Sequence, residues 1–274
     1  ISSILYVLSF SPFNYKVFIF FSLAFLFHSL ENLSIKNKIK AVIYFSLLCD
    51  LLGTSWINYS LINYGSLGHL FSYIITFLFA LIISLPYVLI GLYKSVSSNN
   101  YFYLCYIASL FVLAEYLKSI LYGGFSWLLI GHSQNGTIFD YVYPFLGSFA
   151  VSYLVVLTSL FFYKAFNDRN KISLFFSSAL LAVYFLNPIL HNNENTRDLD
   201  TVSYTLYQPN IYPQQSYDSA QYSLIMKKYN AIINMNKTSD LVIFPETILP
   251  IPFSREDEFF KSFQTTTDNT NMLI

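Results

Sequence analysis

The stretch LFSYIITFLFALIISLPYVLIGLY, residues 70–93, contains no charged side chain. An α-helix needs about 20 consecutive apolar residues to cross the hydrocarbon core of a bilayer, with a range of about 17–25. This stretch is long enough, and it is bounded on both sides by polar residues. It therefore predicts a transmembrane helix.

Six further apolar runs lie within the first 190 residues. The alternative, that these runs are buried helices of a water-soluble protein, is disfavoured by their number. The seven expected spans are Ile1–Phe10, Tyr15–Leu30, Ile39–Leu61, Leu70–Tyr93, Tyr101–Leu121, Tyr143–Phe166 and Ile172–Leu190. Because the chain begins inside an apolar run and ends in NMLI, which is typical of the start of a strand, we expect both ends to be truncated.

Composition divides the chain into two parts. Of all residues, 55% are hydrophobic and 11% are charged, whereas a soluble domain carries about 25% charged residues. The deficit falls on residues 1–190, and residues 191–274 resemble ordinary soluble sequence. We therefore expect a transmembrane helical domain over 1–190 and a water-exposed domain over 191–274. The net charge of zero gives no basic field for nucleic acid.

Basic residues in the loops indicate the orientation. Seven of the nine Lys and Arg side chains before residue 191 fall in alternating loops: Lys36, Lys38, Lys40, Lys94, Lys164, Arg169 and Lys171. The other two, Lys16 and Lys118, lie at the opposite side. Since cytoplasmic loops carry the excess of Lys and Arg, seven spans place residues 191–274 outside the cytoplasm.

The second part alternates between strand and helix patterns. TVSYTLYQPNI (201–211) predicts a strand that ends near Gln208, and Asp218 is the expected N-cap of a helix that continues to about Asn236. A buried strand is expected at Leu241–Phe244, a helix within 254–263, and a strand from 271. This order is typical of an α/β layered domain, of which the chain holds the first portion.

Glu246 is the strongest catalytic candidate. It directly follows Pro245 at the exit of the strand LVIF, and α/β sheets build their sites at the carboxyl ends of strands. A carboxylate there could act as a general base. The alternative is a solvated surface glutamate at a strand end.

The apolar runs contain a few charged and potentially metal-binding side chains. Glu115 and Lys118 are three residues apart, so they can pair on one helix. Two roles are expected for them: a structural pair that holds the outer loop, or contact with a lipid headgroup. Asp50 has no evident partner and is expected to face the interior of the bundle. The two cysteines and four histidines share no metal-ligand spacing, so neither a metal nor a cofactor is expected; these residues are Cys49, Cys105, His28, His69, His132 and His191.

Five short motifs, in the same order along the chain, resemble those of the apolipoprotein N-acyltransferases, a family of membrane enzymes in the nitrilase superfamily. VIFPETILP (242–250) is similar to the family's W-P-E-[ST]-x-x-P, and YQPNIYPQQSYD (207–218) to Q-G-[ND]-I-x-Q-x-x-K-W-D. GFSWLLIGHSQ (124–134) resembles G-F-P-W-x-x-x-G-[YH]-[ST]-Q. AEYLKS (114–119) and LSFSPFN (8–14) resemble E-[WY]-L-[RK] and S-x-x-P-F. The resemblance runs over essentially the whole chain.

The resemblance implies a fold and a reaction. The second part would begin a nitrilase-like αββα sandwich on the periplasmic side of the bacterial inner membrane. The enzyme would move an acyl chain from a phospholipid to the N-terminal amine of a diacylglyceryl-cysteine lipoprotein, through a thioester. Glu246 would be the general base of a Glu–Lys–Cys triad whose Lys and Cys lie beyond residue 274, so this chain alone is expected to be inactive. Substrate-binding roles would fall to Tyr217, Trp127, His132 and Gln134.

This sequence departs from the family pattern at four positions. Phe244 and Tyr217 replace tryptophans, Ser126 replaces a proline, and Pro209 replaces a glycine. The aromatic changes keep a flat apolar surface, whereas Pro209 removes a backbone donor. Two alternatives stay open: a membrane transporter or receptor with a non-catalytic external α/β domain, and a non-catalytic nitrilase-like membrane protein in which Glu246 is a relic.

Overall fold

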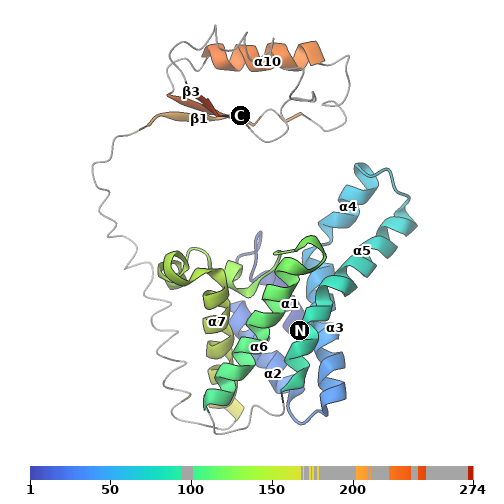
Figure 1. Ribbon diagram of the computed structural model, residues 1–274, viewed down its shortest axis with the longest axis vertical. Helices are drawn as coiled ribbons and strands as arrows, with labels where there is room; N and C mark the ends of the chain where they lie inside the picture. Colours follow the sequence, from blue (N-terminus) through green and yellow to red (C-terminus); the bar gives the residue numbers. More distant parts are fainter. Residues whose placement is uncertain are drawn as a thin grey trace. The chain divides into compact units, whose positions relative to one another are not determined.

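The computed structural model describes residues 1–93, 101–167, 202–208, 210–211, 222–235, 240–244 and 271–273, together with residues 169, 173, 175 and 178. The chain divides into two compact units, Ile1–Glu194 and Asn195–Ile274 (Figure 1).

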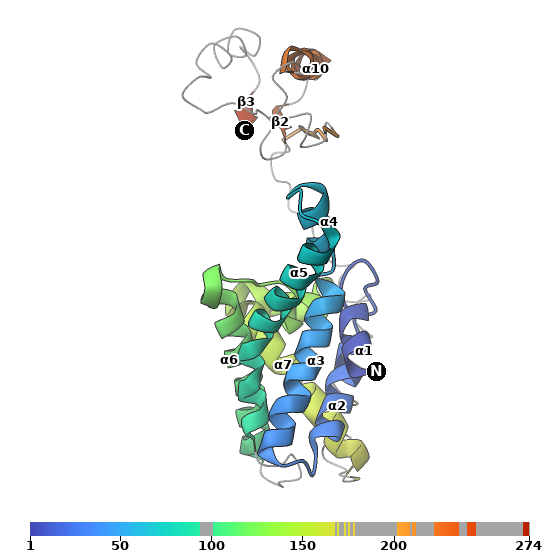
Figure 2. The same ribbon diagram turned by 90° about the vertical axis from the view of Figure 1, so that its right-hand side faces the viewer.

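The first unit is helical (Figures 1 and 2). Its α-helices are α1 (Ser2–Leu8), α2 (Phe18–Leu30), α3 (Ile35–Gly53), α4 (Trp56–Asn63), α5 (His69–Ser84), α6 (Tyr101–Ile120) and α7 (Tyr143–Asn167). Short 3-10 helices lie at η1 (Leu85–Leu92), η2 (Leu121–Gly123), η3 (Ile130–Gln134) and η4 (Ile138–Tyr141). Both views show α4 and the first turns of α5 projecting beyond the other helices of the bundle.

Helix α2 packs one face into the core of the bundle. It packs against α1 and α7, while α6 packs against α7 and η1. Leu23 and Phe27 are fully buried, and the ring of Phe27 meets that of Phe111 on α6 edge to face, with centroids 5.6 Å apart. On the outer surface large apolar side chains are exposed; Phe25, for example, is 51% exposed. Apolar residues on both the inner and the outer faces of a helix are typical of a membrane span rather than a soluble helix.

Three helices are long and apolar enough to cross a bilayer: His69–Leu92, Tyr101–Ile120 and Tyr143–Asn167. A fourth span results if α3 and α4, which are bent by 51° at their junction, count as one. The expectation of a multi-span helical membrane domain is therefore confirmed with three or four candidate spans among the described residues. The expected seventh span, Ile172–Leu190, lies mostly outside the described residues.

The first two expected spans are shorter than the sequence predicts. Helix α1 has 7 residues and α2 has 13, because the turn between them extends over residues 9–17 and takes in the end of the first run and the start of the second. Pro12 disfavours helical backbone at the residue before it, and Asn14 adopts a positive φ of 57°. The third expected span, Ile39–Leu61, breaks after Gly53, so its last residues form the separate helix α4.

The second unit contains a three-stranded parallel sheet in the order β1-β2-β3. Its elements are β1 (Tyr204–Leu206), α10 (Tyr222–Met235), β2 (Leu241–Ile243) and β3 (Asn271–Leu273). These positions match the strands and the first helix expected from the sequence; the helix expected within 254–263 lies outside the described residues.

Helix α10 packs on the sheet through an apolar cluster. Ile225, Tyr229 and Ile232 contact Val242 and Phe244, and the rings of Tyr229 and Phe244 meet edge to face at 5.3 Å. Burying one such side chain is worth about 1.5–3 kcal/mol. The polar strand ends are tied as well, because Ser203 donates its amide and its hydroxyl to Oδ2 of Asp240 at 2.8 and 2.6 Å. These hydrogen bonds lower the pKa of the Asp240 carboxyl.

Candidate functional site

A cavity of about 790 Å³ opens where α1, α3 and α6 end. Three segments that follow or end these helices form its walls: the turn after α1, the α3–α4 junction and the loop after α6. The lining residues are Val7, Ser9, Phe10, Ser11, Pro12, Phe13, Asn14, Lys16, Leu52, Gly53, Ser55, Trp56, Ser126, Trp127, Leu128, His132, Ser133 and Asn135. Because the three helices run in the same direction along the bundle, the cavity lies at one end of the membrane unit.

The lining is amphipathic. Phe10, Leu52 and the two tryptophans supply apolar surface, and hydroxyl, amide, imidazole and ammonium groups supply the polar part. Trp56 and Trp127, the only tryptophans of the chain, meet edge to face with centroids 5.7 Å apart. Lys16 is basic, and none of the described lining residues is acidic. Such a cavity suits a molecule with an apolar body and a polar or anionic head.

Two of the predicted substrate-binding residues line this cavity. Trp127 is 51% exposed, so its indole is available for contact. His132 is exposed as well, although the protein around it removes part of its hydration and lowers the pKa of its imidazole below the usual value. The neutral imidazole is therefore favoured near pH 7, and it can donate and accept one hydrogen bond each.

Gln134 is placed differently. Its side chain is fully buried and is not part of the cavity wall. Its Nε2 donates to the backbone carbonyl of Lys16 at 3.2 Å and to Oγ of Ser133 at 2.9 Å. Gln134 thus joins the loop after α6 to the turn after α1. A direct role in binding substrate stays a prediction for this residue, and Tyr217 and Glu246 lie outside the described residues.

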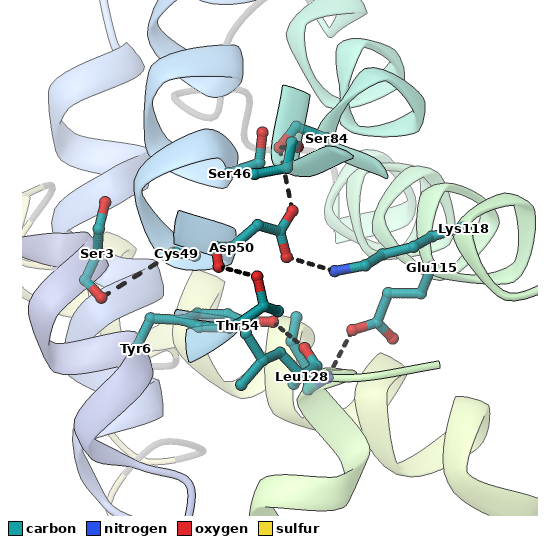
Figure 3. A network of polar contacts seen from close by, with 12 residues as sticks. Ser3, Tyr6, Ser46, Cys49, Asp50, Thr54, Ser84, Glu115, Lys118 and Leu128 are labelled. Carbon is teal, nitrogen blue, oxygen red and sulfur yellow. Dashed lines mark hydrogen bonds and ion pairs between the residues drawn. The ribbon is translucent and has the colours of Figure 1, made fainter. Parts of the chain in front are cut away.

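Below the cavity the bundle holds a buried ion pair (Figure 3). Nζ of Lys118 on α6 lies 2.6 Å from Oδ1 of Asp50 on α3, and both side chains are at most 2% exposed. Oγ of Ser84, at the end of α5, donates to Oδ2 of Asp50 at 3.0 Å. The structure thus supplies the partner of Asp50 that was not evident in the sequence, and the expected place of Asp50 in the bundle interior is confirmed.

The pairing of Glu115 with Lys118 that their spacing allows is not found among the described residues. Lys118 turns to Asp50, and Oε1 of the fully buried Glu115 accepts the backbone N–H of Ile130 at 2.5 Å. Sequence spacing misses both contacts, because they join segments that are 68 and 15 residues apart. The sequence did contain a signal for the ion pair. Asp50 and Lys118 carry opposite charges and each lies in an apolar run, and buried charges require partners.

In the part of the chain that the structure describes, no group of three or more His, Cys, Asp or Glu side chains could hold a metal ion. Cys49 is buried on α3 and Cys105 is partly buried on α6. The described features of the site are thus an amphipathic cavity, a loop that carries Trp127 and His132, and a buried polar layer beneath it.

Comparison with known proteins gives the chain a family. Residues 2–161 match the family model described as the apolipoprotein N-acyltransferase N-terminal domain. The apolipoprotein N-acyltransferases of Haemophilus ducreyi and Haemophilus influenzae are each 26% identical to this chain, over 97% and 100% of its length. That of Aquifex aeolicus is 27% identical over 94%.

The chain spans about half the length of these relatives, 54% of the two from Haemophilus and 56% of the one from Aquifex aeolicus. The match of the family model covers the whole described bundle up to the last turns of α7, including the cavity and the buried ion pair. The chain belongs to the apolipoprotein N-acyltransferase family.

Proposed function

We propose that this chain is the membrane-embedded part, and the first portion of the catalytic domain, of an enzyme that acylates lipoproteins. The enzyme transfers an acyl chain from a phospholipid to the N-terminal amine of a diacylglyceryl-cysteine lipoprotein. The observation that carries the proposal is the family match over residues 2–161. Relatives named apolipoprotein N-acyltransferase that align with 97% and 100% of the chain support it.

The membrane unit supports a reaction between two lipids. Both substrates are held in a bilayer, so an enzyme that joins them needs a site open to the membrane surface. The cavity at the ends of α1, α3 and α6 has the required character, since Trp56 and Trp127 offer apolar surface while Lys16 offers a cation. We assign the acyl chain and the glycerol region to the tryptophans, and the phosphate of the donor headgroup to Lys16 and His132.

The proposed chemistry follows a ping-pong course. A cysteine thiolate attacks the carbonyl carbon of the phospholipid ester, the ester C–O bond breaks, and a lysophospholipid leaves with a proton returned by the general acid. The lipoprotein amine then attacks the thioester, the C–S bond breaks, and the base takes the proton of the amine. A lysine and backbone amides would stabilise the two oxyanions.

Glu246 is the proposed general base. Strand β2 ends at Ile243, and Glu246 follows three residues later. Because β1, β2 and β3 are parallel, their carboxyl ends share one edge of the sheet, where α/β folds place their chemistry. This arrangement supports the assignment of the second unit to a nitrilase-like sandwich. The chain's two cysteines lie in α3 and α6, so we expect no thioester on this chain alone.

The proposed location is the bacterial inner membrane with the second unit on the periplasmic side. The distribution of Lys and Arg over the alternating loops supports this orientation. It also assigns the loops that line the cavity to the outer side, on which the second unit would lie.

Lipid binding to the cavity tests the proposal on this chain directly. In the Trp56→Phe variant, Trp127 is the sole tryptophan. A phospholipid with bromines near the start of one acyl chain should quench its fluorescence saturably in detergent micelles. Lys16→Met should weaken the apparent affinity at least about 10-fold, because it removes one charge-assisted contact of about 1.5–3 kcal/mol.

Two controls make this test specific. Lys36 is exposed at the start of α3 and does not line the cavity, so Lys36→Met should leave the affinity unchanged. A brominated diacylglycerol, which has no phosphate, should bind equally to the parent and to Lys16→Met. Quenching that does not saturate, or that ignores the change at Lys16, would contradict the assignment of the headgroup to this cavity.

A further inference from the structure

The wall of the cavity between Trp127 and His132 contains a residue in an unusual backbone conformation. Leu128 has a φ of +60° and is only 6% exposed. A bulky residue other than glycine rarely adopts a left-handed conformation, and such strain persists only where the surroundings hold it in place. The segment from Leu128 to Gly131 must therefore be restrained from outside.

Four hydrogen bonds from three helices restrain this segment. Each joins a buried or half-buried side chain to a backbone group of the segment. The hydroxyl of Tyr6 on α1 donates to the carbonyl of Leu128 at 2.8 Å, and the amide of Ile130 donates to Glu115 on α6 at 2.5 Å. Two residues of α7 hold Gly131. Its amide donates to Oγ of Ser152 at 2.8 Å, and its carbonyl accepts from the hydroxyl of Tyr143 at 2.5 Å.

Close packing adds to these bonds. A Cβ on Gly131 would lie 2.2 Å from the backbone oxygen of Ser148, so the loop touches α7 where no side chain fits. On the other side, the end of the Leu128 side chain occupies the space that a side chain at Gly53 would need, with 2.4 Å between Cδ1 and the position of such a Cβ. The loop is thus held against the ends of α3 and α7 together.

We propose that Glu115 is a positioning residue, which fixes the wall that presents Trp127 and His132 to the cavity. Its carboxyl oxygen accepts the hydrogen bond at 2.5 Å inside the bundle, where a backbone amide left without an acceptor would destabilise the loop by the free energy of its desolvation. It binds the amide of Ile130, the first residue of η3, between the two cavity residues in sequence. Figure 3 shows Glu115 directed to the loop near Leu128 and Lys118 directed to Asp50.

The pairing of Lys118 with Asp50 explains why Glu115 can serve the loop. Lys118 follows Glu115 by three residues on α6 and would compete for its carboxylate if it were free. Asp50 engages that ammonium at 2.6 Å, and Oε1 of Glu115 accepts the amide of Ile130. Asp50 therefore contributes to the wall indirectly, from α3.

Trp127 supplies the readout. In the Trp56→Phe background its accessibility to acrylamide reports on the wall without any lipid present. Glu115→Ala should raise the quenching constant at least about two-fold, because the Ile130 amide loses its acceptor. Glu115→Gln retains a carbonyl oxygen at the same place and should stay near the parent. Glu31→Gln, the same substitution at the residue that follows α2, is the matched control and should change nothing.

The unchanged protein gives a second measurement, which does not depend on the folding of any variant. Amide hydrogen exchange over 128–132 should be at least about 100-fold slower than over the loop 64–68, because the Ile130 and Gly131 amides have buried acceptors. Equal exchange in the two loops would overturn the proposal. So would an unchanged Trp127 in a folded Glu115→Ala, or a Glu115→Gln that behaves like Glu115→Ala.

Only one part of this inference rests on the proposed function, namely that the wall presents Trp127 and His132 to a lipid substrate. Neither acrylamide quenching nor hydrogen exchange uses lipid, so a failure of lipid binding would contradict the proposed function and leave the role of Glu115 standing. If the wall were mobile in a protein that binds the brominated phospholipid normally, the role of Glu115 would be contradicted and the proposed function would stand.

Discussion

The carboxylate of Asp50 on α3 and the ammonium of Lys118 on α6 lie 2.6 Å apart in the interior of the bundle. The two residues are 68 positions apart in the chain. Ser84 adds a hydrogen bond to the same carboxylate, so α3, α5 and α6 meet at one buried polar point. A small hollow lined by Tyr6 and Leu128 adjoins the pair, which places it next to the loop that forms the cavity wall.

Removing one member of this pair should destabilise the bundle strongly. Asp50→Leu or Lys118→Met leaves an uncompensated buried charge, and we expect a loss of about 3–5 kcal/mol. The double variant should recover most of this loss, because it buries no charge at all. Thermal unfolding in micelles, followed by circular dichroism, measures the effect.

Lys36→Met serves as the control for the loss of one positive charge, because this lysine is exposed. The temperature at the midpoint of its thermal unfolding should equal that of the parent within experimental error. If the single variants at Asp50 and Lys118 were as stable as Lys36→Met, the ion pair would not contribute to the stability of the bundle.

Gly131 should not tolerate a methyl group. In Gly131→Ala the new Cβ would lie 2.2 Å from the oxygen of Ser148, so the loop or α7 must shift, at a cost of about 1–3 kcal/mol. Acrylamide quenching of Trp127 should rise as well. Gly68→Ala is the matched control, because no atom lies within 4 Å of its Cβ and its φ is −63°. Equal stability of the two alanine variants would refute the close approach.

The second unit should lie outside the cytoplasm. The prediction follows from the seven basic residues that fall in alternating loops between the apolar runs of the sequence. A phosphatase that is active only after export, fused after Asn192, should be active, and a fluorescent protein that folds only in the cytoplasm should be dark at the same position. The reverse pattern would contradict the orientation and, with it, the proposed reaction.

Glu246 should be essential for thioester formation. The test uses a protein that joins this chain to a second half carrying the lysine and cysteine of the proposed triad. There Glu246→Gln keeps the shape of the side chain but removes the base, and it should lower thioester formation from labelled phospholipid by at least about 100-fold. Label released by hydroxylamine measures the thioester.

Glu256→Gln is the control for this experiment, because Glu256 follows Ser254 within a stretch expected to begin a helix and should matter far less. Near-normal rates in Glu246→Gln would leave only the alternative of a surface glutamate at a strand end.

Local features of this protein were predictable from its sequence. Length and apolarity of the runs identified the spans at Leu70–Tyr93, Tyr101–Leu121 and Tyr143–Phe166, whose helices lie within a few residues of these bounds. An alternating pattern and a short apolar run placed strands at the observed positions of β1 and β2, respectively. Short motifs indicated the family that the comparison with residues 2–161 shows. Each of these signals lies within about 25 neighbouring residues, where periodicity and composition decide the outcome.

Contacts between distant segments were decided by the tertiary structure alone. Helical spacing allowed a pair between Glu115 and Lys118, but the approach of α3 gave Lys118 a better partner in Asp50 and left Glu115 to the Ile130 amide. Leu128, 75 residues beyond Gly53, likewise fills with its side chain the space beside that glycine. A buried charge must find a partner, but only the packing of the helices determines which partner is within reach.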